Sequence, residues 1–202
     1  MSIKGDLVSI YEVTDKVSGG WLETLKNTMS NVYKGHFEDK FNDMMKLLLK
    51  NKITENEVLE WVDSLWGFEK DIYFSIVNKN LLSESEIKRF LLSKILFYQI
   101  RNGKLDYFHS NILTNIDLFV EDDFNVFNII CNQNEKNIQH TFETDSYKTT
   151  ISKFKTIGII PMEDFIVSES SPKCWDESNY KFNKETNDYE SLCKYINEYF
   201  SS

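Results

Sequence analysis

Residues 83–101, SESEIKRFLLSKILFYQIR, form the stretch of this chain that decides its fold. On a helix of 3.6 residues per turn, the apolar side chains of this stretch leave almost no continuous polar face. These apolar residues are Ile87, Phe90, Leu91, Leu92, Ile95, Leu96, Phe97, Tyr98 and Ile100. A helix that is apolar nearly all round must be covered on most sides. We therefore predict a central helix over Ser83–Arg101, with other helices packed around it.

Both ends of this helix carry signals in the sequence. Ser83 and Glu86 have the S-x-x-E spacing of a capping box, in which each residue satisfies a backbone N–H near the other. Arg101 lies near the negative end of the helix dipole, and Gly103 can close the helix in a left-handed cap. The pattern predicts a helix with a defined start and stop.

Helical spacing also dominates the first half of the chain. Over Trp21–Lys50 the apolar residues recur at helical offsets, and Gly35 interrupts the run. We read this region as one helix, a break at Gly35, and a second helix that begins near Phe37.

A second capping box, made by Thr54 and Glu57, opens the next helical run, which continues to Val77. Gly67 lies inside this run, where a glycine costs about 1 kcal/mol relative to alanine. We expect a close helix contact or a break at Gly67. Asn78–Leu82 is predicted to be the loop that leads into the central helix.

The last third of the chain has a less regular pattern. Asp106 can cap a helix that continues to Ile116, and a C-terminal helix can start near Asn187. Between them, periodicity does not decide whether residues 124–130 form a strand or a helix, and residues 156–160 also fit either. The mainly α fold is thus predicted to be a helical bundle with a small mixed α/β C-terminal portion.

The polar, asparagine-rich segment 131–139 is the candidate boundary between these parts. We expect residues 1–131 to form the bundle core and residues 138–202 to pack on it as the smaller portion, together making one domain. A chain of 202 residues is long enough for one sizeable core. Its 15 Phe, 10 Tyr and 4 Trp make that core rich in aromatic side chains, while 2 Pro and 7 Gly leave few turn residues and disfavour an all-β fold.

The formal net charge of −9 bears on the class of partner. An acidic surface repels phosphate backbones, so nucleic acid is not an expected partner, whereas a basic protein is. The N-terminus has no basic segment followed by an apolar run, and no stretch approaches 18 uninterrupted apolar residues. We therefore expect a soluble cytoplasmic protein that does not contact membranes.

Motifs for metal or nucleotide chemistry are missing from the sequence. His36, His109 and His140 lie far apart, so no two of them have the i+3 or i+4 spacing of two metal ligands on one helix. No H-E-x-x-H motif occurs, and a His-x-x-Glu pair such as His140 and Glu143 is common by chance. The seven glycines form neither a P-loop nor a dinucleotide-binding motif. We predict no cofactor and no metal.

The three cysteines, Cys131, Cys174 and Cys193, show no C-x-x-C spacing, and we interpret them as reduced structural thiols. Cys131 with His109 or His140 is the one pairing that could suggest a nucleophile and its base, although no local catalytic signature accompanies it. An enzyme that uses Cys131 or a pair of carboxylates is therefore kept as an alternative.

Two acidic regions remain as candidate partner-binding surfaces. One is a predicted loop near residue 120, and the other lies between Met162 and Phe200, where acidic residues outnumber lysines by nine to four. A solvated surface is the simpler interpretation, but the interleaved aromatic residues could anchor a basic partner that the charges attract. Trp175, the proposed anchor, could equally fill the core. The candidate residues are Asp117, Glu121, Asp122, Asp123, Glu163, Asp164, Trp175, Asp176, Glu177 and Tyr180.

These observations favour a stoichiometric binding protein, for example an immunity or inhibitor protein that neutralises a basic toxin or nuclease. Such a protein should be a monomer or dimer on its own. An enzyme without a recognisable motif and an assembly or scaffold protein are the alternatives.

Overall fold

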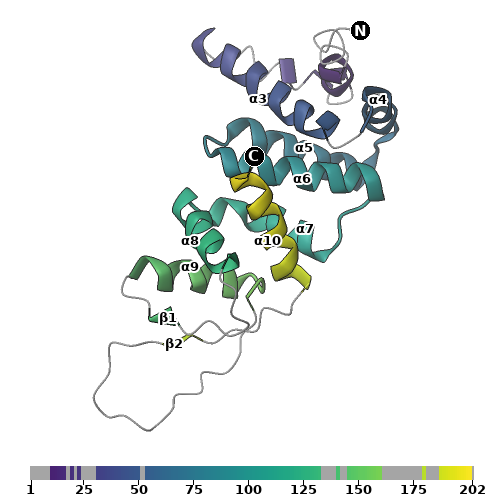
Figure 1. Cartoon of the computed structure of the whole chain (residues 1–202). Helices are drawn as coiled ribbons and strands as arrows, with labels where there is room; N and C mark the ends of the chain where they lie inside the picture. The colour runs from purple at the N-terminus through teal and green to yellow at the C-terminus, as the bar shows by residue number, and fades with distance from the viewer. Residues whose placement is uncertain are drawn as a thin grey trace, which may run out of the picture. The chain divides into compact units, whose positions relative to one another are not determined.

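The chain is mainly helical (Figure 1). Its computed structural model describes residues 10–16, 19–20, 22–23, 31–50, 53–132, 140–141, 145–160, 179–180 and 187–201. The chain divides into two compact units: unit 1 is Met1–Leu113 and unit 2 is Thr114–Ser202.

Unit 1 is built around the helix predicted to be central. Its main helices are α3 (Asn31–Lys50), α4 (Glu55–Ser64), α5 (Gly67–Leu82), α6 (Glu86–Asn102) and the start of α7 (Tyr107–Asn115). Both α3 and α5 pack against α6 and against each other, as Figure 1 shows. The buried residues of α6 occur on every side of the helix: Ile87, Phe90, Leu91, Leu92, Ser93, Lys94, Ile95, Leu96 and Gln99. The expectation that this helix is covered on most sides is confirmed.

The two ends of α6 differ in how well the sequence predicted them. At the C-terminal end, Gly103 has a left-handed φ of 74°, its N–H donates back to the last turn at 2.8 Å, and Arg101 lies in that turn. The predicted cap is confirmed there. At the N-terminal end, the predicted box of Ser83 and Glu86 is wrong, because the helix begins at Glu86 with Ser85 as its cap residue. Ser83 ends α5 instead.

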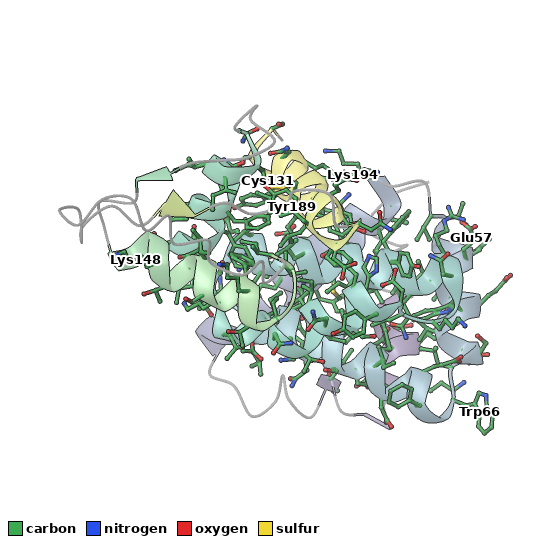
Figure 2. The ribbon with its side chains drawn as sticks, turned by 90° about the horizontal axis from the view of Figure 1, so that it is seen from below. Glu57, Trp66, Cys131, Lys148, Tyr189 and Lys194 are labelled. Atoms are coloured by element: carbon green, nitrogen blue, oxygen red, sulfur yellow. A yellow bond between two sulfur atoms is a disulfide. The ribbon has the colours of Figure 1, made fainter. Side chains whose placement is uncertain are left out.

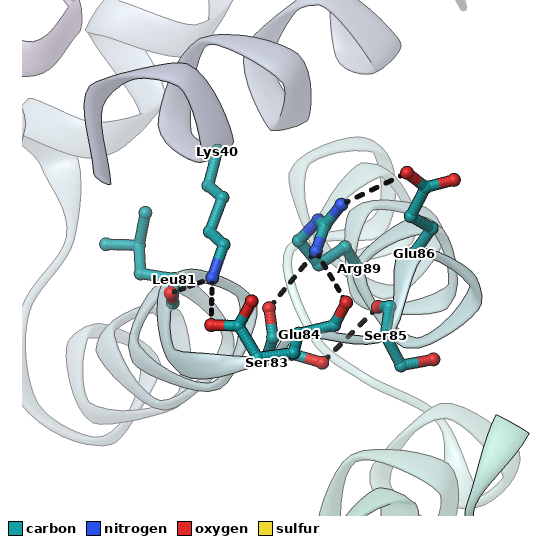
Figure 3. A network of polar contacts seen from close by, with 7 residues as sticks. All are labelled: Lys40, Leu81, Ser83, Glu84, Ser85, Glu86 and Arg89. Atoms are coloured by element: carbon teal, nitrogen blue, oxygen red, sulfur yellow. Dashed lines mark hydrogen bonds and ion pairs between the residues drawn. The ribbon is translucent and has the colours of Figure 1, made fainter. Parts of the chain in front are cut away.

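Two cations hold the short connection between α5 and α6 (Figure 3). Lys40 of α3 donates to the carbonyl oxygen of Leu81 at 3.3 Å and pairs with the Glu84 carboxylate at 2.8 Å. Arg89 of α6 donates to the carbonyl oxygens of Ser83 and Glu84, both at 3.2 Å. Positive charge is favourable at the C-terminal end of α5, where carbonyl groups lack helical partners. Contacts from two other helices therefore decide that Ser83 closes α5.

α3 runs without interruption through Gly35, so the break predicted there is wrong. One glycine costs about 1 kcal/mol in a helix. Burial of one large apolar side chain contributes about 1.5–3 kcal/mol. α3 buries several of them: Phe37, Phe41, Met44, Met45 and Leu48. Packing of this face outweighs the glycine.

The second capping box is confirmed at the start of α4. The Glu57 N–H donates to Thr54 Oγ1 at 3.2 Å, and the Thr54 N–H donates to Glu57 Oε2 at 2.7 Å. The hydrogen bonds from the Thr54 backbone and side chain lower the pKa of the Glu57 carboxyl. Arg101 of α6 lies 3.1 Å from the other side of this carboxylate, so the same residue also joins α4 to α6.

A break is confirmed at Gly67, which starts α5 with a φ of +55°. The loop predicted at Asn78–Leu82 is wrong, because α5 continues to Leu82. Asn80 is fully buried there, and its side-chain amide donates to the carbonyl oxygen of Arg89 at 2.9 Å. This contact with α6 makes a polar residue suitable for the buried face of α5.

The described residues of unit 2 include a short 3-10 helix, η1 (Ile116–Leu118), and the α-helices α8 (Glu121–Cys131), α9 (Asp145–Thr156) and α10 (Asn187–Phe200). α8 packs against both α9 and α10. Aromatic rings fill the space between them: Phe154 of α9 lies 4.5 Å from Phe119 and 4.4 Å from Phe127, between ring centroids. Tyr189 of α10 lies 5.5 Å from Phe127. The C-terminal helix expected near Asn187 is confirmed.

The mixed α/β C-terminal portion is not supported. In the described part of unit 2, the strands are limited to the two-residue segments β1 (His140–Thr141) and β2 (Asn179–Tyr180), which pair antiparallel with His140 opposite Tyr180. The division between the units follows Leu113 and so lies earlier than the boundary expected within residues 131–139. The reason is that α8, expected to belong to the first part, packs with α9 and α10.

Candidate interaction surface

The acidic residues near position 120 belong to the start of a helix, and not to a loop as expected. Asp117 lies in η1, and Glu121, Asp122 and Asp123 form the first turn of α8. Acidic side chains are favourable there because the first N–H groups of a helix carry partial positive charge. Val120 precedes the helix in an extended conformation, with φ of −107° and ψ of 170°.

Asp123 differs from its acidic neighbours because it is buried, with only 3% of its surface exposed. Its carboxylate accepts hydrogen bonds from the Val120 N–H at 2.8 Å, the Thr150 hydroxyl at 2.6 Å and the Lys153 ammonium group. Burial alone raises the pKa of this carboxyl, but the bonds from Lys153, Thr150 and Val120 together outweigh burial and lower the pKa. Asp123 joins α8 to α9, so its predicted role in partner binding is corrected to a structural one.

The remaining residues of this segment form an exposed patch. Asp117, Glu121 and Asp122 are exposed, and so are the apolar side chains of Leu118 (55%) and Val120 (58%). We call these five residues the 117–122 surface. Three exposed carboxylates and two half-exposed apolar side chains therefore occur within six consecutive residues. Apolar side chains together with charged ones are typical of the surfaces that proteins use to bind other proteins.

The 117–122 surface rests on a well-packed base. Phe119 and Phe124, which lie between and just after the exposed residues, are only 1% and 2% exposed. Their rings face Phe154 of α9, with Phe119 stacked on it at an interplanar angle of 20°. A binding surface held by packed side chains loses little conformational freedom when it binds.

A disulfide between Cys131 and Cys193 joins the C-terminal end of α8 to α10, across a sequence separation of 62 residues. The expectation of reduced thiols is therefore wrong for these two cysteines, while Cys174 lies outside the described residues. The Cys131 sulfur is bonded to Cys193, so this structure offers no Cys131 thiolate for the nucleophilic chemistry considered above. α8 is thus fixed at both ends: to α9 by Asp123 and to α10 by the disulfide.

Among the other candidates, Glu163, Asp164, Trp175, Asp176 and Glu177 lie outside the described residues. The backbone of Tyr180 lies in β2, opposite His140. Among the candidates that lie in the described residues, those near residue 120 are close together, and Asp117, Glu121 and Asp122 are surface residues.

His109 and Asp106 form a carboxylate–imidazole contact, a combination of groups that can carry out acid–base chemistry. His109 Nδ1 lies 2.6 Å from Asp106 Oδ1, and the same oxygen accepts the His109 backbone N–H at 2.8 Å. The ring is 4% exposed and stacks on Tyr98 at 3.8 Å between centroids. The Asp106 carboxylate therefore caps the first turn of α7, as the sequence predicted, and these contacts give His109 a structural role.

Sequence reasoning missed one prominent feature of unit 1. Trp66 and Phe68, on either side of Gly67, are 79% and 76% exposed, and Figure 2 shows Trp66 projecting away from the ribbon. For Trp66 a signal was available, because it lies outside the apolar stripe that includes Trp61, Leu65 and Ile72. Phe68 falls within that stripe, seven residues after Trp61, so helical spacing did not predict its exposure.

Within the described ranges, no group of three or more His, Cys, Asp or Glu side chains is placed to hold a metal ion. None of the helices described in the structure combines the length and apolar character needed to cross a membrane. No protein-family model, no curated protein and no solved structure matches this chain.

Proposed function

We propose that this protein acts by stoichiometric binding, and that the 117–122 surface binds a basic protein. The observation that carries the proposal is the exposure of Leu118 and Val120 among the carboxylates of Asp117, Glu121 and Asp122. An immunity or inhibitor protein that neutralises a basic toxin or nuclease would use such a surface. In this proposal the protein performs no chemistry of its own and needs no cofactor.

The charges and the apolar side chains would contribute differently to binding. Exposed carboxylates, together with the net charge of −9, attract a basic partner over a distance and raise the association rate. Leu118 and Val120 would be buried in the complex, and apolar burial of this kind mainly slows dissociation. Added salt should therefore weaken binding mainly by lowering the association rate, because salt screens exposed charges.

The test is affinity capture from the source cells with the wild-type chain and with the variant Glu121→Lys/Asp122→Lys. A basic protein retained by the wild type at low salt and lost with the variant supports the proposal. Capture of only the free chain, or equal retention by both, contradicts it. The variant Glu38→Lys/Asp39→Lys is a matched control, since it reverses an adjacent, exposed Glu–Asp pair on α3.

Charge reversal in the first turn of α8 also opposes the helix dipole and can cost up to about 1 kcal/mol for each residue. The variant Glu121→Gln/Asp122→Asn separates the two effects, because it removes the charges without adding opposite ones. Circular dichroism of all variants shows whether the helices are kept.

The proposal places the protein in the cytoplasm. Disulfides are rare there because cellular reductants keep thiols reduced. Rapid alkylation of cell extracts, followed by mass measurement, therefore tests this part separately. Alkylated Cys131 and Cys193 would agree with a reducing compartment, whereas an intact disulfide would move the protein to an oxidising one.

A further inference from the structure

The turn between α4 and α5 exposes two large aromatic side chains. Trp66 is 79% exposed and Phe68 is 76% exposed, and only Gly67 separates them. We call these two residues the aromatic turn. Each apolar side chain of this size contributes substantial free energy when it is buried, so leaving both in water forgoes that gain in the isolated chain. Trp is also the residue type most enriched at binding hot spots.

The residues before the aromatic turn are held firmly. Val62 and Leu65 are buried, at 1% and 7% exposed, and the Leu65 N–H donates to the Val62 carbonyl oxygen at 3.3 Å. The Ser64 hydroxyl donates to the carbonyl oxygen of Trp61 at 2.7 Å, and the Trp61 ring packs edge-on against Tyr73 at 5.5 Å. The end of α4 is therefore fixed to α5.

The residues after the aromatic turn are also anchored. Gln99 of α6 is fully buried, and its side-chain amide donates to the carbonyl oxygen of Glu69 at 3.3 Å. Gly67 adopts a φ of +55°, which residues with a side chain rarely adopt, and this conformation starts α5 directly after Trp66. The turn thus presents Trp66 and Phe68 from a backbone fixed on both sides, which lowers the entropy lost on binding.

The charge around the aromatic turn is negative. Residues 60–71 contain four exposed carboxylates and one lysine. The carboxylates are Glu60, Asp63, Glu69 and Asp71. The lysine, Lys70, lies over the Phe74 ring, with its Nζ 5.7 Å from the ring centroid. A surface of two aromatic side chains among carboxylates is complementary to apolar residues flanked by lysine or arginine.

We propose that the aromatic turn is a second protein-binding surface, and that its occupant is a basic protein presenting apolar residues flanked by lysine or arginine. The charge argues against two other occupants. A second copy of this chain would bring carboxylates against carboxylates, and its own net charge is −9. An anionic membrane would repel the same carboxylates. This surface lies in unit 1 and does not depend on the 117–122 surface of unit 2.

A synthetic helical peptide with one leucine stripe flanked by lysines is the probe. Surface plasmon resonance would measure its binding to the full chain at about 0.05 M and about 0.3 M salt, where exposed charges are screened to different extents. The test variant is Trp66→Ala/Phe68→Ala, which removes exposed side chains and should leave the fold intact. The matched control is Tyr107→Ala, since Tyr107 is also 76% exposed in unit 1.

We expect the wild type and Tyr107→Ala to bind the peptide equally, and Trp66→Ala/Phe68→Ala to bind it at least about tenfold more weakly. Higher salt should weaken wild-type binding, and a peptide with glutamate in place of lysine should not bind. Equal binding by Trp66→Ala/Phe68→Ala, or no binding by the wild type, overturns the proposal.

Three further measurements distinguish the other outcomes. If the wild type sediments as a dimer and Trp66→Ala/Phe68→Ala sediments as a monomer, the aromatic turn binds a second copy of the chain. Binding to phosphatidylcholine vesicles that the same variant abolishes would assign it to a membrane. Loss of peptide binding in Glu121→Lys/Asp122→Lys, with normal binding by Trp66→Ala/Phe68→Ala, would assign the peptide to the 117–122 surface. Each result overturns the inference, and the last does so while supporting the proposed function.

Discussion

Reduction of the Cys131–Cys193 disulfide should lower the stability of unit 2 by several kcal/mol. The bond closes a loop across 62 residues, and a crosslink stabilises a protein largely by restricting the unfolded chain. The loop-closure relation for a loop of this length gives about 4 kcal/mol at 25 °C. With a urea dependence of about 2 kcal/mol per molar, the unfolding midpoint should fall by about 2 M.

The reduced protein should nevertheless keep α10 in place. Leu192 and Ile196 of α10 are fully buried, and Tyr189 packs edge-on against Phe127 of α8 at 5.5 Å. These contacts do not involve the sulfur atoms. Circular dichroism of the reduced protein without urea should therefore match that of the oxidised protein.

The assay is urea unfolding followed by circular dichroism, with and without dithiothreitol, in a Cys174→Ala background that leaves a single pair of thiols. The variant Cys131→Ala/Cys193→Ala is the control, because the reductant has nothing to reduce in it. An unchanged midpoint of Cys174→Ala after reduction would refute the loop-closure reasoning. A shift of Cys174→Ala that is matched by an equal shift of the control would show that the reductant acts elsewhere.

Three further predictions concern single side chains. Asp123→Ala should cost about 3 kcal/mol because it leaves the buried Thr150 hydroxyl without its acceptor. Folding lowers the pKa of Asp123, so the contribution of its carboxylate to stability is complete above about pH 4 and is lost as the pH falls through the lowered value. The free energy of unfolding should therefore fall less steeply with decreasing pH in the variant than in the wild type. Identical curves of stability against pH would contradict this. Leu96→Ala, in buried α6, should lower the free energy of unfolding by about 3 kcal/mol, measured by urea unfolding. The control Leu82→Ala, at a side chain that is 56% exposed, should lower it by under about 0.5 kcal/mol. Equal losses of stability would disprove the central position of α6. Thr54→Ala should lower the stability of unit 1 by about 1 kcal/mol, measured by thermal unfolding, and no loss would mean that the capping box adds nothing.

Signals between residues close in sequence predicted much of the fold. The apolar residues of α6, the cap at Gly103, the box at Thr54 and Glu57, and the Asp106 cap of α7 are all confirmed. The caps and the box each depend on residues within one or two helical turns, and the apolar pattern of α6 depends on the spacing within one continuous segment. Local backbone geometry decides such features, so a single sequence contains enough information to predict them.

Similar local signals failed where another helix competes. The S-x-x-E pattern at Ser83 predicted a capping box, but Lys40 and Arg89 hold this region as the end of α5. Gly35 predicted a break, but the buried face of α3 keeps the helix continuous. Tertiary packing overrides weak local preferences of about 1 kcal/mol.

By itself the sequence determined the mainly helical class, the central helix and the excess of acidic residues that makes a basic partner plausible. Only the tertiary structure decided which acidic residues face water and which cysteines pair. Asp123 is buried by Thr150 and Lys153, which lie 27 and 30 residues away, and Cys131 meets Cys193 across 62 residues. Exposure and disulfide pairing depend on groups that only folding brings together, so no local pattern encodes them.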